Sequence, residues 1–397
     1  MRRIVSLAMV ACLAACRGEP PRDPGDRELA LLVDSLRPDV ERAAGLPFRG
    51  PTTFELRSKE EVRDFLLEKL RQEFPPERQE GIEAVYTLLG LLPDTLDLKQ
   101  LLLDLYTEQV AGFYDPERKT LYGVRGADPA QLRLVLAHEL VHALQHQYLP
   151  LDSIMHLRSN SDRQTAVQAV LEGQATLASI RALTPGTDLL ATPEFWQLFR
   201  EQIKTAQSSM EVFSRAPLAL KEGLIFPYLN GAEFMKWWDS ARAGHPLPSL
   251  DEMPRSTEQI LHTGRYDRRD LPVPVAFDDA EAALYEDTMG ELELHLLRAV
   301  LQNGDQVHTE VPAGWGGDRF RAYRSPNGPA LVWYLVWDDA ESLGRFLTNT
   351  GRLLERLPRA GYRTDVSTMP NAAAPTLRIV IAPTGWARWS RLPTLSP

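Results

Sequence analysis

The chain has 397 residues, of which 44% are apolar and 25% charged, so it can bury a sizeable core and is not globally disordered. The length fits one large domain together with a smaller one. The formal net charge is −10 at pH 7, which gives the chain no electrostatic footprint for nucleic acid. Nucleic acid is therefore excluded as the expected partner.

The first residues are typical of a processing signal rather than of folded structure. Arg2 and Arg3 form a positively charged start, residues 4–11 are apolar, and the stretch is too short to span a bilayer. Its ending, Leu-Ala-Ala-Cys, resembles the lipobox of bacterial lipoproteins, which implies cleavage before Cys16 and acylation of its thiol. We therefore expect residues 1–15 to be a lipoprotein signal peptide. The alternative is a plain secretory signal with an incidental cysteine.

The processed protein is expected to be exported and held on the membrane of the cell envelope by the lipid on Cys16. Residues 16–27 are polar and rich in proline and glycine, as in a tether. Arg17 stands where inner-membrane retention would require aspartate, which favours the outer membrane, its periplasmic face or the cell surface. Both cysteines, Cys12 and Cys16, lie in this segment, which excludes cysteine catalysis in the processed protein.

Apolar periodicity predicts helices over residues 28–37, 39–45, 58–72, 77–91 and 95–109. Pro38 separates the first two of these helices. The third begins at Ser58 with a Ser-Lys-Glu-Glu sequence that fits a capping box. A short strand is expected over residues 53–57.

Residues 111–124 predict a β-hairpin, because two aromatic-containing runs flank a polar turn. Two interpretations of its role stay open. An exposed edge strand can pair with a substrate in extended form. Alternatively, Phe113, Tyr114 and Tyr122 pack the domain.

The next segments are again helical. Asp128 followed by Pro129 predicts a capped helix that continues to about residue 148. Ser161 or Asp162 opens another helix that ends near residue 183. Further helical signals cover residues 194–213 and 230–242.

Charged residues with two prolines over 267–282 predict a domain boundary. After it, the pattern predicts a helix, two strands, a helix and two strands, at 284–302, 318–324, 330–337, 340–356, 361–367 and 376–382. We therefore expect an α+β fold. Its first domain, residues 28–270, is mainly helical with a small hairpin or sheet, and its second, residues 284–397, is a smaller α+β domain.

The helix that begins at Pro129 contains the motif HExxH, formed by His138, Glu139 and His142. Histidines four apart project from one helix face and can reach one Zn²⁺ at about 2 Å. Glu139 lies beside that position and can act as general base. The surrounding residues are apolar, so burying these side chains without a metal would be costly.

Glu172 is the candidate third ligand. It lies 30 residues after His142 on the next predicted helix, an interval that allows a turn and an antiparallel return. The glycine and alanine that follow it suit close helix packing. The sequence therefore predicts a Zn²⁺ site made by His138, His142 and Glu172.

With this ligand set the chain resembles the gluzincins, zinc peptidases with HExxH on one helix and a glutamate ligand on the next. More narrowly, it resembles a group of bacterial exported peptidase-like proteins, through GFYD, HELVHALQ, EGQAT, FPYLNG, STEQILH and GWGGDR at residues 112–115, 138–145, 172–176, 226–231, 256–262 and 314–319. The resemblance implies a zincin-like catalytic domain, a zinc cofactor and a peptide or protein substrate.

Other zinc schemes fit less well. The metzincin pattern requires glycine and histidine where this chain has Gln145 and Tyr148. His146 is too far along the helix to share an ion with His138, since eight residues span about 12 Å. Asp188 is an alternative ligand, but it follows a Pro-Gly loop.

Peptide hydrolysis also needs a donor that stabilises the oxyanion. The candidates are Tyr228, His262 and Tyr266, of which the sequence favours His262 and Tyr266 because their segment is polar and belongs to the resembling patches. An alternative interpretation of His262 is a surface histidine at a capped helix.

Two other functions stay open. One is a catalytically inactive lipoprotein that uses zinc as a structural staple and acts as an adaptor or binding module. The other is a zinc hydrolase of cell-wall amide or ester bonds.

Overall fold

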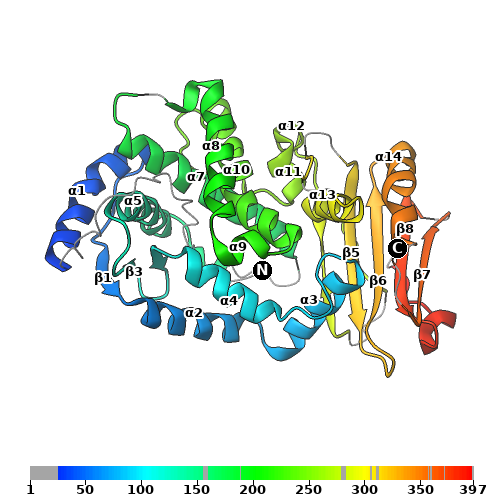
Figure 1. Ribbon diagram of the computed structural model, residues 1–397. Helices are drawn as coiled ribbons and strands as arrows, with labels where there is room; N and C mark the ends of the chain where they lie inside the picture. Colours follow the sequence, from blue (N-terminus) through cyan, green and yellow to red (C-terminus); the bar gives the residue numbers. More distant parts are fainter. Residues whose placement is uncertain are drawn as a thin grey trace.

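The computed structural model has an α+β fold, as the sequence predicts, with a mainly helical N-terminal part and a smaller α+β C-terminal part (Figure 1). The expected signal peptide, Cys16 and most of the tether lie outside the described residues. None of the helices in the described ranges has the length and apolar character that a membrane crossing needs. The structure describes residues 26–154, 160–187, 189–278, 283–304, 306–309, 313–355, 357, 360–370 and 372–395.

The first helix, α1 (Asp26–Ala44), continues through Pro38, so the prediction of two helices separated there is wrong. Val33 before the proline and Val40 after it are buried in one apolar cluster with residues of two later helices. Proline removes one backbone hydrogen bond and adds a steric clash. Burial of the continuous apolar stripe offsets that cost, because tertiary packing supplies most of the stability of protein helices.

Three short strands form a small sheet in the N-terminal part: β1 (Thr53–Arg57), β2 (Gly112–Asp115) and β3 (Thr120–Val124). Their order is β1-β3-β2, with β1 parallel and β2 antiparallel to β3. The predicted strand and the predicted hairpin are both confirmed.

Three helices accompany this sheet close to their predicted positions: α2 (Lys59–Glu73), α3 (Pro76–Leu88) and α4 (Leu98–Gln109). The predicted capping box is present at the start of α2. The Ser58 hydroxyl accepts a hydrogen bond from the Glu61 N–H at 3.1 Å, and the Glu61 carboxylate accepts one from the Ser58 N–H at 2.7 Å. Two otherwise unpaired backbone donors of the first turn are thereby satisfied.

The centre of the helical part consists of α5 (Pro129–His146), α7 (Ser161–Leu183) and α10 (Leu218–Ala241). The first two match their predictions, and Asp128 caps α5 by accepting from the Gln131 N–H at 3.0 Å. The other elements here are short or peripheral: α6 (Leu151–Ile154), η1 (Leu189–Ala191), α8 (Pro193–Ser208) and α9 (Glu211–Arg215).

Two helix predictions in this region are corrected. The helical signal at 194–213 comprises two helices, α8 and α9, and the signal at 230–242 is only the second half of α10. Pro227 lies inside α10, where the sequence pattern reads as a helix break. Phe226 and Leu229 on either side of it are buried, so core packing again overrides the proline.

The helices α7 and α10 cross at a pair of glycines. A Cβ added to Gly173 would lie 2.2 Å from the Gly231 carbonyl oxygen, and one added to Gly231 would lie 2.0 Å from the Ala169 carbonyl oxygen. Any side chain at either position would force the helices apart. The small residue after Glu172 therefore serves the contact of α7 with α10.

The C-terminal part is an antiparallel sheet in the order β4-β5-β6-β8-β7. Its strands are β4 (Tyr285–Asp287), β5 (Trp315–Tyr323), β6 (Ala330–Trp337), β7 (Tyr362–Thr368) and β8 (Thr376–Pro383). Its helical elements are α13 (Gly290–Leu301), α14 (Ala340–Phe346), η2 (Leu347–Gly351), α15 (Arg352–Leu354) and η3 (Ala387–Ser390).

The predicted helix over 284–302 is wrong at its start, where the chain forms the strand β4. The buried Asp318 carboxylate explains where α13 begins. It accepts hydrogen bonds from the Met289 and Gly290 N–H groups, both at 2.9 Å, and from the indoles of Trp315 and Trp333. A carboxylate at the first turn satisfies free N–H groups and favours a helix start.

The two parts share one core. The largest apolar cluster contains Leu66 and Leu103 from the helical part together with Trp333 and Ile379 from the C-terminal sheet. Between the parts lie α11 (Thr257–Leu261) and α12 (Thr263–Asp267), followed by the segment predicted as a boundary. Figure 1 shows α13 between the helical part and the sheet.

Candidate metal centre

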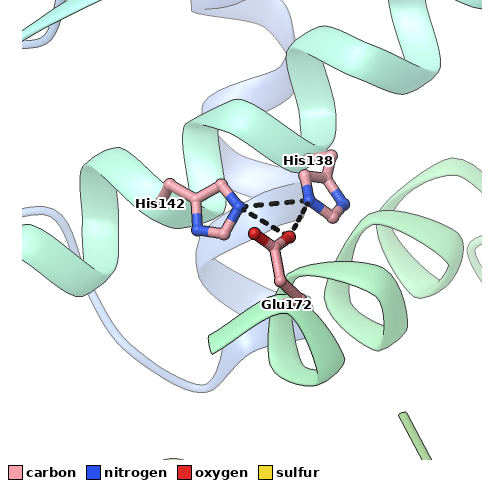
Figure 2. A group of neighbouring side chains, drawn as sticks. All are labelled: His138, His142 and Glu172. Carbon is pink, nitrogen blue, oxygen red and sulfur yellow. Dashed lines mark hydrogen bonds and ion pairs between the residues drawn. The ribbon is translucent and has the colours of Figure 1, made fainter. Parts of the chain in front are cut away.

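The helix α5 carries two different faces. Leu136, Leu140 and Leu144 lie on one face and are buried in an apolar cluster with α1 and α7. His138 and His142 project from another face of the same helix, toward α7 (Figure 2). The apolar stripe therefore holds the helix in place without using the histidines.

The structure brings the three predicted ligands together, as Figure 2 shows. Glu172 Oε2 lies 3.1 Å from His138 Nε2 and 3.3 Å from His142 Nε2, and the two Nε2 atoms lie 3.1 Å apart. All three side chains are at most 2% exposed.

These distances fit a metal ion well. A tetrahedral ion with bonds of about 2.0–2.1 Å places its ligand atoms about 3.3 Å apart. Glu172 Oε1 is also buried and has no hydrogen-bond partner among the described residues. Two imidazoles with one carboxylate form a donor set typical of Zn²⁺.

The electrostatics of the cluster favour a positive charge between the three side chains. Burial alone would lower the pKa of His142, but the Glu172 carboxylate outweighs it and raises that pKa to about 9. Burial alone would raise the pKa of Glu172, but His142 and His138 outweigh it and lower that pKa to about 2. A cation, either a proton or a metal, therefore satisfies this pocket.

Gln145 orients the second imidazole, a role that the sequence analysis missed. Its side-chain oxygen lies 2.8 Å from His142 Nδ1, and its amide nitrogen donates to the Leu171 carbonyl and to the Gln174 side chain, both at 2.9 Å. The amide thus holds the proton of His142 on Nδ1 and leaves Nε2 free to bind a metal. Its position three residues after His142 on one helix was the available signal.

Glu139 is completely buried beside the ligands. Its Oε2 accepts a hydrogen bond from the Tyr114 N–H of β2 at 2.7 Å. The Tyr114 hydroxyl lies 2.9 Å from His146 Nδ1, so His146 belongs to the surroundings of the centre rather than to its ligands.

Of the two open interpretations of the hairpin, the structure favours packing of the domain over an exposed edge strand. Although β2 is an edge of the small sheet, all four of its residues are buried. The Phe113 ring stacks on Tyr122 with centroids 4.8 Å apart, so these aromatic residues pack the domain.

The three candidate oxyanion donors lie in different places. The Tyr228 ring lies beside His138, with centroids 6.0 Å apart, because the glycine crossing brings α10 close to α7. The Tyr266 hydroxyl donates to the Glu252 carbonyl at 2.6 Å, and its ring packs against two tryptophans of α10. His262 lies with Glu291 and His295 in a second cluster. Asp188, the alternative ligand, lies outside the described residues.

A family profile and a solved structure are similar to parts of this chain. The profile of a domain of unknown function, DUF8575, matches residues 280–383, which include α13 and the strands of the C-terminal sheet but not the metal centre. No curated protein matches the chain. A solved structure from Chloroflexus aurantiacus, described as a candidate hydrolase with a novel fold, is similar with a TM-score of 0.42 and 18% identity, over 63% of this chain and 92% of that chain.

Proposed function

We propose that this chain is a zinc-dependent peptidase of the gluzincin type, whose metal is held by His138, His142 and Glu172. The observation that carries the proposal is the convergence of three buried ligand atoms at the separations of a tetrahedral site. The HExxH motif and the resemblance in sequence supply the reaction class.

Glu139 is the general base in this proposal. His138, His142 and Glu172 would hold the Zn²⁺ ion, which would supply a Lewis acid for a scissile carbonyl and for water, whose pKa it would lower toward about 7. The Glu139 carboxylate accepts the proton of the attacking water and then delivers it to the leaving amine. Its hydrogen bond from the Tyr114 N–H orients the carboxylate without neutralising it.

Tyr228 is the oxyanion donor that the geometry favours, in place of His262 and Tyr266. It is the one of the three whose ring lies against a proposed metal ligand. A phenol beside the metal can donate a hydrogen bond to the charge that develops on the carbonyl oxygen.

The burial of the centre constrains how a substrate binds. Glu139 and the three ligands are at most 2% exposed, so little of their own surface is open to a polypeptide in this conformation. The same burial favours the second candidate function, a catalytically inactive protein in which zinc is a structural staple.

Two variants separate these candidates. The full chain, purified in detergent, is assayed for zinc content and for casein cleavage with and without a chelator. Glu139→Gln should keep its zinc and lose cleavage, whereas Glu172→Gln should lose the zinc bound at this centre together with cleavage. The exposed Glu341→Gln is the matched control. Wild-type protein that holds zinc but cleaves neither casein nor peptides would support the staple, and cleavage of peptidoglycan or esters alone would support the cell-wall hydrolase.

We further propose that the protein is exported and attached to the cell envelope through a lipid on Cys16. Cys16→Ser should abolish labelling by a fatty-acid probe and move the protein from the membrane fraction to the soluble fraction. Unchanged fractionation of this variant would contradict the anchor.

A further inference from the structure

A second cluster of metal-ligating side chains lies at the joint between the helical part and the C-terminal sheet. It consists of His262, from the junction of α11 and α12, and of Glu291 and His295 on α13. One ligand atom of each lies within 4.8 Å of the others. His262 Nε2 lies 3.3 Å from both carboxylate oxygens of Glu291, and His295 Nε2 lies 3.3 Å from Glu291 Oε1.

The burial of this cluster is unusual for an ordinary ion pair. Glu291 is 0% exposed and His295 is 4% exposed. Glu291 Oε2 is buried and has no hydrogen-bond partner among the described residues, although His262 lies near it. An unsatisfied carboxylate oxygen in the interior is costly, and a bound cation would satisfy it.

The spacing of the donors also suits a metal. Glu291 and His295 are four residues apart on α13, so both project from one helix face, and His262 meets them from another element. The Ala313 N–H donates to Glu291 Oε1, which orients the carboxylate. The His262 side chain is 11% exposed, so an ion can reach the cluster from solvent.

This cluster is separate from the first centre. The second cluster lies at the amino end of α7, where Asp162 contacts its segments. Asp162 accepts hydrogen bonds from the Thr257 N–H and hydroxyl, and a Cβ added to Gly290, the residue before Glu291, would overlap it. Glu172 lies ten residues further along α7, about 15 Å at ~1.5 Å per residue. Figure 1 likewise shows α13 beside the sheet and α5 on the opposite side of the helical part.

We propose that His262, Glu291 and His295 form a second site for a zinc-class divalent cation, which clamps the helical part to the C-terminal sheet. The donors come from the α11–α12 junction and from α13, and Ala313 precedes β5. A cation there joins two segments of the chain directly, and the Ala313 N–H connects the segment before β5 to the carboxylate ligand. Its binding energy is therefore added to the stability of the folded state.

The test is the zinc stoichiometry of the full chain, purified in detergent, equilibrated with Zn²⁺ and freed of loosely bound metal by gel filtration. Wild type should hold two zinc ions per chain. His138→Ala and His295→Ala should each hold one, and the double variant none. The exposed His245→Ala is the matched control and should hold two.

The outcomes distinguish this proposal from the proposed function. If Glu172→Gln and His138→Ala proteins, folded by circular dichroism, hold no zinc, the second site does not exist and the peptidase proposal stands. If wild type holds one zinc ion that His295→Ala loses and His138→Ala keeps, the first centre fails and the second stands. In the His138→Ala variant a chelator should lower Tm, and Co²⁺ substituted for zinc should give the absorption bands of a tetrahedral site.

Discussion

The two clusters each consist of two histidines and one glutamate, but these residues are distributed differently over the helices. In the first, α5 supplies both histidines and α7 supplies the glutamate. In the second, α13 supplies the glutamate and one histidine, and a helix junction supplies the other histidine. Both glutamates are fully buried with one oxygen that lacks a hydrogen-bond partner among the described residues.

The surroundings of the two clusters differ. The first has a carboxylate, Glu139, that accepts a hydrogen bond from a strand N–H, a phenol, Tyr228, beside one imidazole, and an amide, Gln145, that fixes the other imidazole. The contacts that orient the second cluster include one backbone N–H, from Ala313. Metal donors alone can stabilise a fold, whereas hydrolysis also needs a base, an oxyanion donor and oriented ligands.

The sharpest test of this difference is the proposed oxyanion donor. Tyr228→Phe should lower kcat for casein peptides by about 10²–10³-fold with zinc content unchanged, because one transition-state hydrogen bond is lost. Tyr266→Phe is the matched control. It loses the bond to the Glu252 carbonyl and should cost about 1 kcal/mol of stability with little change in kcat. A larger loss of kcat in Tyr266→Phe than in Tyr228→Phe would favour Tyr266 as the oxyanion donor, as the sequence did.

The amide beside His142 should matter to the first cluster alone. Gln145→Leu should weaken zinc binding at that centre by about 10–100-fold, because the imidazole loses its orienting partner. Competition with a chelator measures the affinity. Gln147→Leu, in the turn that follows, is the control, because the half-buried Gln147 side chain contacts Arg49 and Gly50 instead of the cluster. Equal weakening in both variants would show that the loss is not specific to the amide.

The glycine crossing positions α10 against α7 near the first cluster. Gly231→Ala should lower the free energy of unfolding by about 1–3 kcal/mol, because its Cβ overlaps the Ala169 carbonyl. Gly223→Ala on the same helix has no atom within 4 Å of the added Cβ and should stabilise the protein slightly. Chemical denaturation of both variants measures the difference, and similar midpoints would contradict the close crossing.

A pH-dependent effect is expected at the other end of α7, at Asp162. Burial raises the pKa of Asp162 to about 8, against the opposing hydrogen bonds from Thr257. The Asp162 carboxyl group ionises near pH 4 in the unfolded chain and near pH 8 in the folded chain. Between these pH values the folded state therefore binds one more proton than the unfolded state. Stability should therefore fall as pH rises through that window. Denaturation curves measured at pH 5 and 7.5 should show a smaller decrease in the free energy of unfolding for Asp162→Asn than for the wild type. An equal decrease in both proteins would contradict this role of Asp162.

Much of the local structure could be predicted because its signals are local. The capping box at Ser58, the cap at Asp128 and the strand at 53–57 each depend on residues within a few positions of one another. The same holds for His138 and His142, which any α-helix places on one face. Pro38 and Pro227 misled the prediction, since burial of distant side chains outweighs a local break.

By itself, the sequence determined the α+β class, the histidine pair with its adjacent glutamate, and the choice of Glu172 as the third candidate ligand. Only the tertiary structure decided that Tyr228 rather than His262 lies beside His138, and that His262 meets a glutamate 29 residues further along the chain. The physical reason is the separation along the sequence over which each effect acts. Helix periodicity relates residues within one turn or two, whereas the contact of two helices depends on the packing of everything between them.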